Sequence, residues 1–112
     1  MISIDDFKKL EIKIGLIVSA EKILDADKLL KLSVDFGEET GPRQIVSGIS
    51  LYFPDPQTLV GKKCAFAANL EPRVIRGLES QGMILAVSGD GEDKFFSLLE
   101  TSSNVSPGSM VK

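Results

Sequence analysis

The hydrophobic positions near the start of the chain change their period once. Ser3-Ile4-Asp5-Asp6 is typical of a helix start, because a serine hydroxyl accepts a bond from a free backbone N–H and aspartates suit the positive helix end. Beyond it, Ile12, Ile14, Leu16 and Val18 alternate with Glu11, Lys13, Gly15 and Ile17. A period of two predicts a strand. We therefore expect a short N-terminal helix followed by a strand.

Short apolar segments separated by turn residues continue to the C-terminal part of the chain. Gly37–Pro42 is a hairpin turn between the apolar segments Leu30–Phe36 and Arg43–Ser47. Asn69–Gly82 is a polar loop, and Gly89–Asp93 is a tight acidic turn. Pro54 and Pro56 predict irregular structure near Tyr52 and Phe53. The expected strands are Leu30–Phe36, Arg43–Ser47, Lys63–Ala68, Met83–Val87 and Phe95–Leu99. Together these elements predict an all-β protein, a small closed barrel with one brief helix.

The size of the chain fits a single domain. We expect all 112 residues to form one unit, with a barrel over about residues 7–100 and a C-terminal extension over about 101–112. No apolar run approaches the roughly 18 residues that cross a bilayer, and the N-terminus lacks the basic start of a signal peptide. The single cysteine, Cys64, predicts a reducing compartment and hence a cytoplasmic location without membrane partners.

The composition favours binding over catalysis. The chain holds no histidine, which excludes imidazole acid–base chemistry and histidine-ligated metal sites, and one cysteine cannot build a thiolate zinc site. Most of the 16 acidic residues fall in turns or alternate with polar residues, as solvated side chains do. We therefore expect no catalytic residues, no metal site and no cofactor.

The charge is uneven along an acidic chain. A net charge of −3 argues against a protein that coats itself with nucleic acid. Between Gly61 and Ser88, however, four basic residues stand against two acidic ones. A local basic face on an acidic protein is therefore compatible with the sequence.

Two segments carry more information than the alternation. The first is Arg43–Ile49, and the second, Ala68–Ala86, contains the pattern N-L-x-P-R followed by R-G-x-E-S-Q-G-M-x-L-A. Together with Phe7–Gly15 and Ala26–Leu29, they closely resemble the tRNA-binding domain family, in order from about Phe7 to Ala86. That family includes the C-terminal domain of methionyl-tRNA synthetases, free-standing tRNA-binding proteins and an export chaperone. The resemblance implies an oligonucleotide-binding (OB-fold) five-stranded barrel, with dimerisation through the segment after it.

The side chains in these segments suit RNA. Arg73 and Arg76 can offer guanidinium groups to phosphate oxygens, while Asn69, Ser80 and Gln81 supply uncharged donors and acceptors. The resemblance implies that Asn69, Ser80 and Met83 lie at the RNA surface, together with two lysines of the second strand, Lys28 and Lys31. The full set of expected RNA-binding residues is Lys28, Lys31, Asn69, Arg73, Arg76, Ser80, Gln81 and Met83.

Simpler interpretations of the same residues stay open. The two arginines can be solvated loop charges, and Lys28 and Lys31 can be surface charges that pair with nearby aspartates. The Asn69 side chain can simply cap the loop through a hydrogen bond to its own backbone, and Met83 can belong to the core. The ordered block of residues, and no single side chain, favours RNA binding.

Three functions remain at this point. The first is a non-catalytic module that recognises the folded shape of tRNA, and the second is an export-type peptide-binding chaperone with contacts at Tyr52, Phe53 and Met83. The third is an appended or separately encoded domain of methionyl-tRNA synthetase that also forms a homodimer. Val105, Met110 and Val111 are the expected dimer contacts, unless these apolar residues fold back on the barrel.

Overall fold

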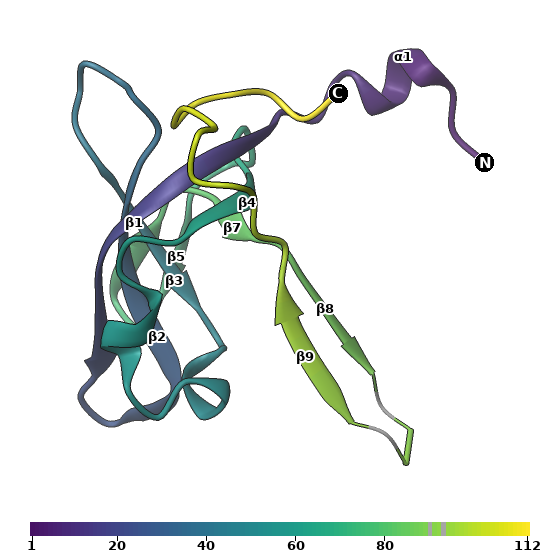
Figure 1. Ribbon diagram of the computed structural model, residues 1–112. Helices are drawn as coiled ribbons and strands as arrows, with labels where there is room; N and C mark the ends of the chain where they lie inside the picture. The colour runs from purple at the N-terminus through teal and green to yellow at the C-terminus, as the bar shows by residue number, and fades with distance from the viewer. Residues whose placement is uncertain (90, 93) are drawn as a thin grey trace.

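The computed structural model describes residues 1–89, 91–92 and 94–112. Most of the secondary structure is strand, as expected (Figure 1). Within the described residues, five strands form one antiparallel sheet in the order β3-β2-β1-β4-β7, and β5–β6 and β8–β9 form two separate hairpins. The elements are α1 (Ile4–Phe7), β1 (Ile12–Ile23), β2 (Ala26–Asp35), β3 (Arg43–Ser47), the 3₁₀ turns η1 (Ser50–Tyr52) and η2 (Pro56–Leu59), β4 (Lys63–Ala67), β5 (Arg73–Ile75), β6 (Leu78–Ser80), β7 (Met83–Ile84), β8 (Ala86–Gly89) and β9 (Phe95–Leu98).

The N-terminal helix is a single turn. Ser3 caps it as expected, because its Oγ accepts a hydrogen bond from the Asp6 N–H at 3.1 Å. None of its residues is buried, so α1 owes little to core packing. In the part of the chain that the structure describes, no helix has the length and apolar character needed to traverse a bilayer.

The first two strands are longer than the alternation indicated. β1 continues to Ile23, and β2 begins at Ala26 after the two-residue connection Leu24–Asp25. A register shift between Ile17 and Ser19 breaks the simple alternation, leaving Val18 40% exposed while Ile17 is fully buried. Pairing with β2 therefore extends a strand that periodicity alone ended at Val18.

Gly15 faces the core and leaves room for two neighbours. A Cβ on this residue would lie 2.4 Å from Val34 Cγ1 and 2.8 Å from Phe36 Cε1. Both of those side chains belong to the hydrophobic core, which also includes Ile17. The inward face of β1 therefore carries Gly15 and Ile17 rather than the apolar series that includes Ile14.

Ile14 is buried, and its backbone is paired with the C-terminal tail. Its N–H donates to Ser109 O at 2.9 Å, and its carbonyl accepts from Gly108 N at 2.7 Å. Val111 N donates to Ile12 O at 2.8 Å, so the tail pairs with the start of β1 (Figure 1). The backbone of the tail thus folds back on the sheet, while the side chains of Met110 and Val111 stay 43% and 40% exposed.

The later strands differ from expectation in two places. The polar loop Asn69–Gly82 contains the β5–β6 hairpin, and the single strand expected over Met83–Val87 is divided at Leu85 into β7 and β8. β3, β4 and β9 lie close to the expected bounds. The expected acidic turn Gly89–Asp93 includes Asp90 and Asp93, which lie outside the described residues.

The expectation of a closed barrel is wrong, because the sheet ends at β3 and β7 and no ladder joins these two strands in the part of the chain that the structure describes. Side chains occupy the outer edge of β3 instead. The Ser80 hydroxyl accepts a bond from Val46 N at 3.0 Å, and the Gln81 side chain accepts one from Gln44 N at 3.1 Å. Gln81 N also donates to Gln44 O at 2.8 Å. Ser80 at the end of β6 and Gln81 after it therefore satisfy this edge without adding a strand to the sheet.

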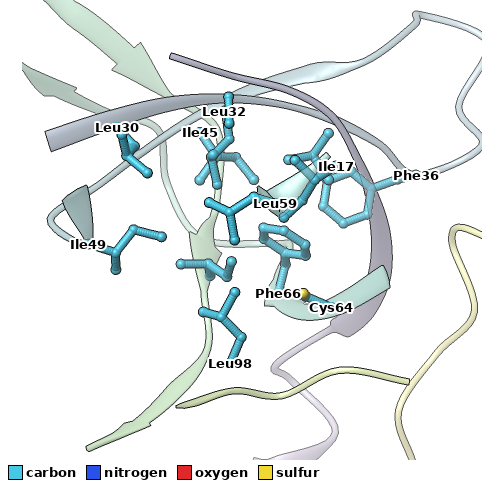
Figure 2. Close-up of a cluster of buried hydrophobic side chains, with 13 residues drawn as sticks. Ile17, Leu30, Leu32, Phe36, Ile45, Ile49, Leu59, Cys64, Phe66 and Leu98 are labelled. Carbon is cyan, nitrogen blue, oxygen red and sulfur yellow. The ribbon is translucent and has the colours of Figure 1, made fainter. Parts of the chain in front are cut away.

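One cluster of apolar side chains fills the interior of the curved sheet (Figure 2). Phe66 is fully buried at its centre and meets Phe36 edge to face, with ring centroids 5.3 Å apart. Phe53 packs against the same cluster, while Tyr52 stays 54% exposed and stacks on Phe96 at 4.0 Å. The core thus holds the sheet rigid beneath the loops that join its strands.

Candidate nucleic-acid interface

The β5–β6 hairpin turns through Arg76 and Gly77. Ile75 pairs with Leu78, so only these two residues form the turn, and their φ angles are 53° and 79°. Positive φ at both positions is the geometry of a type I′ turn, which favours Asn, Asp or Gly. Arginine in this conformation is strained by roughly 1 kcal/mol or more. An arginine at this tip therefore points to a role outside the hairpin itself.

The tip of the hairpin faces the turn between β1 and β2 across a shallow groove. The groove has a volume of about 640 Å³. Lys28 contributes to it from the start of β2 and Arg76 from the hairpin, although they lie far apart in the sequence. Its lining consists of Asp25, Ala26, Asp27, Lys28, Leu29, Ile75 and Arg76.

The groove combines charges of both signs. Neither Lys28 nor Arg76 has a carboxylate within 4.0 Å among the described residues, so both cations are available to a ligand. Asp25 and Asp27 place carboxylates on the same lining. Cations bind phosphate oxygens, and carboxylates accept hydrogen bonds from exocyclic amino groups or ribose hydroxyls. The groove is therefore suited to a nucleotide rather than to a bare polyanion.

Arg73 lies at the other end of β5. It is exposed, and the strand rise places it about 10 Å from Arg76 along the hairpin. Arg73 pairs with Ser80 across the hairpin, whereas Val74 pairs with Glu79 on the opposite face. Val74 is 74% exposed, so that outer face is presented to solvent.

Three of the expected RNA-binding residues have polar groups engaged within the fold. Ser80 is 2% exposed, and its hydroxyl also donates toward Gly82 O at 3.1 Å. Asn69 accepts from Glu11 N and donates to Lys9 O, both at 2.7 Å, and so ties the loop to the N-terminal segment. Gln81 is exposed while its carbonyl oxygen is bonded to Gln44 N. The Ser80 hydroxyl is thus buried within the fold, where it joins the hairpin to β3.

The other two expected residues lie on the sheet. Lys31 Nζ is 3.6 Å from Glu21 Oε2, which is the surface ion pair foreseen as the simpler interpretation, although with a different acid. Met83 is 40% exposed at the start of β7 and does not belong to the buried core. Of the eight expected residues, the structure brings Lys28 and Arg76 into one groove and leaves the other six outside its lining.

Sequence reasoning assigned no role to several residues that the structure places here. Asp25 and Asp27 share the groove with the cations, and Ile75 supplies an apolar wall. Arg43 stands in the first information-rich segment, and its guanidinium reaches the loop. The signal for Asp25 and Asp27 was their position beside Lys28, but only the folded hairpin brings Arg76 to them.

Comparison with known proteins places the chain in a family. Residues 12–110 match the family model described as "Putative tRNA binding domain". A methionine–tRNA ligase of Lactiplantibacillus plantarum is 41% identical over 110 residues, a match that covers 98% of this chain and 16% of the ligase. The chain therefore spans about a sixth of the length of the curated relatives that it matches.

Two solved structures are similar over the whole chain. The MetRS related protein from Pyrococcus horikoshii has a TM-score of 0.89 and 40% identity, and the match covers 100% of this chain and 98% of that one. The CsaA chaperone protein from Picrophilus torridus has a TM-score of 0.82 and 26% identity, with 100% of both chains covered. The family match spans nearly all of the residues, and the chain belongs to the tRNA-binding domain family.

Proposed function

We propose that this chain binds tRNA as a non-catalytic module, through the groove between the β1–β2 turn and the β5–β6 hairpin. The observation that carries the proposal is the convergence of Lys28 and Arg76 on that groove, with Arg73 further along the hairpin. Phosphate contacts through these cations supply affinity, and the polar and carboxylate groups beside them supply discrimination. Membership in the tRNA-binding domain family supports the choice of tRNA as the nucleic acid.

Recognition rests on the shape of the RNA rather than on stacked single-stranded bases. No aromatic side chain is among the described residues that line the groove. Oligonucleotide-binding barrels that hold single strands depend on aromatic stacking platforms. The curved five-stranded sheet is, in this proposal, an OB-type scaffold that holds the hairpin and the β1–β2 turn at a fixed separation for a folded RNA.

Catalysis is not part of the proposed role. Burial raises the pKa of the Cys64 thiol to about 11, so this cysteine is a protonated core residue at neutral pH and not a nucleophile. The chain supplies no histidine to act as a base. A reduced core cysteine also suits the proposed cytoplasmic location.

The module acts in this proposal with methionyl-tRNA synthetase, either appended to it or as a separate chain. A tethered tRNA-binding module raises the effective concentration of tRNA near a catalytic site, which compensates for a modest intrinsic affinity. The 41% identity to one part of a methionine–tRNA ligase supports this partner.

We also propose that the chain forms a homodimer. Of the tail residues named from the sequence, Met110 and Val111 pair with β1 through their backbones, whereas the β8–β9 hairpin extends away from the main sheet (Figure 1). Val87 is 46% exposed and Phe95 is 56% exposed on this hairpin. A second copy that covers the hairpin would bury these apolar side chains and give a bivalent tRNA-binding particle.

An export-type peptide-binding chaperone is the second candidate. The structural similarity to the CsaA chaperone protein favours it, and so does the exposed Tyr52, which lines a shallow pocket with Phe95 and Phe96. Peptide binding through the aromatic side chains of this pocket would persist at high salt. Binding to tRNA through Lys28, Arg73 and Arg76 would weaken steeply as salt rises.

A titration at two salt concentrations tests the proposal. The purified chain is titrated with total tRNA and with an unstructured RNA of equal length, while light scattering reports its mass in the same buffers. We expect the chain to bind tRNA more tightly than the unstructured RNA, and its affinity for tRNA to fall progressively as the salt concentration rises. Equal affinity for both RNAs would contradict shape recognition, and salt-resistant binding of an apolar peptide without tRNA binding would favour the chaperone.

A further inference from the structure

Arg43 lies where both ends of the loop 69–81 return to the sheet. Its Nη1 donates to Ala68 O at 2.6 Å and to Gln81 O at 3.2 Å. Ala68 directly precedes the loop, and Gln81 is its last residue. One guanidinium group therefore fastens together the two ends of the segment that carries the β5–β6 hairpin.

Glu38 fixes the orientation of this guanidinium. Arg43 Nε donates to Glu38 Oε1 at 2.8 Å, and Arg43 Nη2 donates to Glu38 Oε2 at 2.7 Å. Both side chains are largely shielded from solvent, with exposures of 22% and 29%, and the guanidinium also lies 5.1 Å from the Phe36 ring centroid. A two-point pair holds a planar group in one orientation, which directs Nη1 at the two carbonyls.

The guanidinium has few donors left for a ligand. Arginine carries five N–H donors. Four protein oxygens accept bonds from Arg43, namely two of Glu38 and the carbonyls of Ala68 and Gln81. Arg43 is thus committed to the fold although it is positively charged and lies close to the proposed RNA surface.

The next residue extends the same attachment. Gln44 Nε2 donates to Glu79 O at 2.9 Å, so a second side chain of β3 holds the β6 strand. No ladder joins β3 to β6 among the described residues, and these polar contacts replace it. The position of the hairpin relative to the sheet, and therefore of its tip relative to Lys28, depends on them.

We propose that Arg43 is a positioning residue for tRNA binding, which acts by holding the β5–β6 hairpin where Arg73 and Arg76 meet the RNA. The inference rests on the proposed function. It assigns to Arg43 no contact with RNA, since its effect passes through the two hairpin arginines. Glu38 is the residue that orients Arg43 for this task.

A double-mutant cycle separates positioning from direct contact. Arg43→Lys preserves the charge but replaces the planar two-point donor with a single ammonium group. We expect the substitution to lower tRNA affinity by roughly tenfold in the otherwise unchanged chain, a typical size for coupled residues. In a chain that already carries Arg73→Ala and Arg76→Ala, the same substitution should have no further effect. An additive loss in both backgrounds would overturn the inference.

Hydrogen exchange provides a readout without RNA. The Gln81 amide donates to Gln44 O and should exchange faster after Arg43→Lys, whereas the Ile17 amide, bonded to Lys62 O, should be unaffected. Unchanged exchange at Gln81 would overturn the inference even if tRNA binding fell. Uniformly faster exchange at both amides would show general destabilisation and would also overturn it.

A second variant covers the case in which Arg43→Lys does not fold. Glu38→Gln keeps Arg43 but removes its charged partner, and Glu39→Gln is a matched control on an exposed neighbour. We expect Glu38→Gln to reduce tRNA affinity and Glu39→Gln to leave it unchanged or slightly raised. Equal effects of the two would overturn the inference. If the unchanged chain binds no tRNA, the proposed function itself fails, and altered exchange at Gln81 would still identify Arg43 as a structural clamp.

Discussion

The Ser80 hydroxyl and the backbone N–H of Val46 form a buried hydrogen bond of 3.0 Å between the base of the β5–β6 hairpin and the edge of β3. Through this bond and the Arg43 contacts, a segment without ladder pairing to the sheet is held against it. The cationic hairpin tip is thereby carried on a rigid support, which is the condition for recognising a folded RNA by shape.

Replacement of Ser80 by alanine should destabilise the fold. The substitution leaves the buried Val46 N–H without its acceptor, and an unsatisfied buried donor costs about 1–3 kcal/mol. Chemical denaturation measures the change, with Ser88→Ala on exposed β8 as the control. Unchanged stability together with lost tRNA affinity would instead make Ser80 a direct RNA contact.

The two hairpin arginines should set the salt dependence of tRNA binding. Removal of both by Arg73→Ala and Arg76→Ala should flatten the slope of log affinity against log salt by about two units, because two phosphate contacts are lost. Lys8→Ala with Lys112→Ala removes the same charge beside α1 and should change the slope far less. Equal slopes for the two double variants would indicate a diffuse charge effect.

Arg76 lowers the stability of the fold through its strained turn conformation, and we expect it to strengthen tRNA binding through its guanidinium group. Because Arg76 has a φ of 53°, Arg76→Gly should be more stable than Arg76→Ala by roughly 1 kcal/mol. Both variants should weaken tRNA binding equally, since both lose the guanidinium. Thermal unfolding and RNA titration measure the two effects, and an Arg76→Gly variant with full affinity would exclude this residue from the interface.

The Glu38–Arg43 pair should contribute to stability in a pH-dependent way. The hydrogen bonds from Arg43 hold the pKa of Glu38 below its ordinary value of 4.5. A carboxyl with a lowered folded-state pKa contributes stability above its unfolded-state pKa and loses that contribution as the pH falls through the folded-state value. The Glu38→Gln variant should therefore be less stable than the unchanged chain at neutral pH. Its free energy of unfolding should fall less steeply as the pH is lowered. Glu39→Gln should retain the original dependence, as urea unfolding below about pH 5 will show.

The β8–β9 hairpin should control the oligomeric state. Phe95→Glu introduces a charge at an exposed apolar position and should convert a dimer to a monomer in light scattering. Val111→Glu in the tail should leave the mass unchanged if the hairpin forms the contact, and a fall in mass for this variant would place the dimer contact in the tail. A monomeric unchanged chain would contradict the proposed dimer.

Sequence patterns predicted local structure well where short-range rules decide it. Ser3 caps the helix, β3 has the expected bounds, and the turn after β2 joins it to β3 as a hairpin. The candidate site was located less completely. Arg73 and Arg76 are exposed as expected, but Ser80 is buried. The sequence did not predict this burial, because a residue pattern does not reveal that the outer edge of β3 is satisfied by side chains rather than by a strand.

What the sequence by itself determined is the all-β class, the positions of most of the strands and the family, since alternation, turn residues and an ordered motif are all local in the chain. Only the tertiary structure decided which face of β1 is inward. Gly15 lies on that face, where a Cβ would collide with the Val34 side chain. The tertiary structure also decided that the sheet stays open and that Lys28 meets Arg76 in one groove. These features depend on contacts between residues distant in sequence, whose geometry is fixed by packing and not by periodicity.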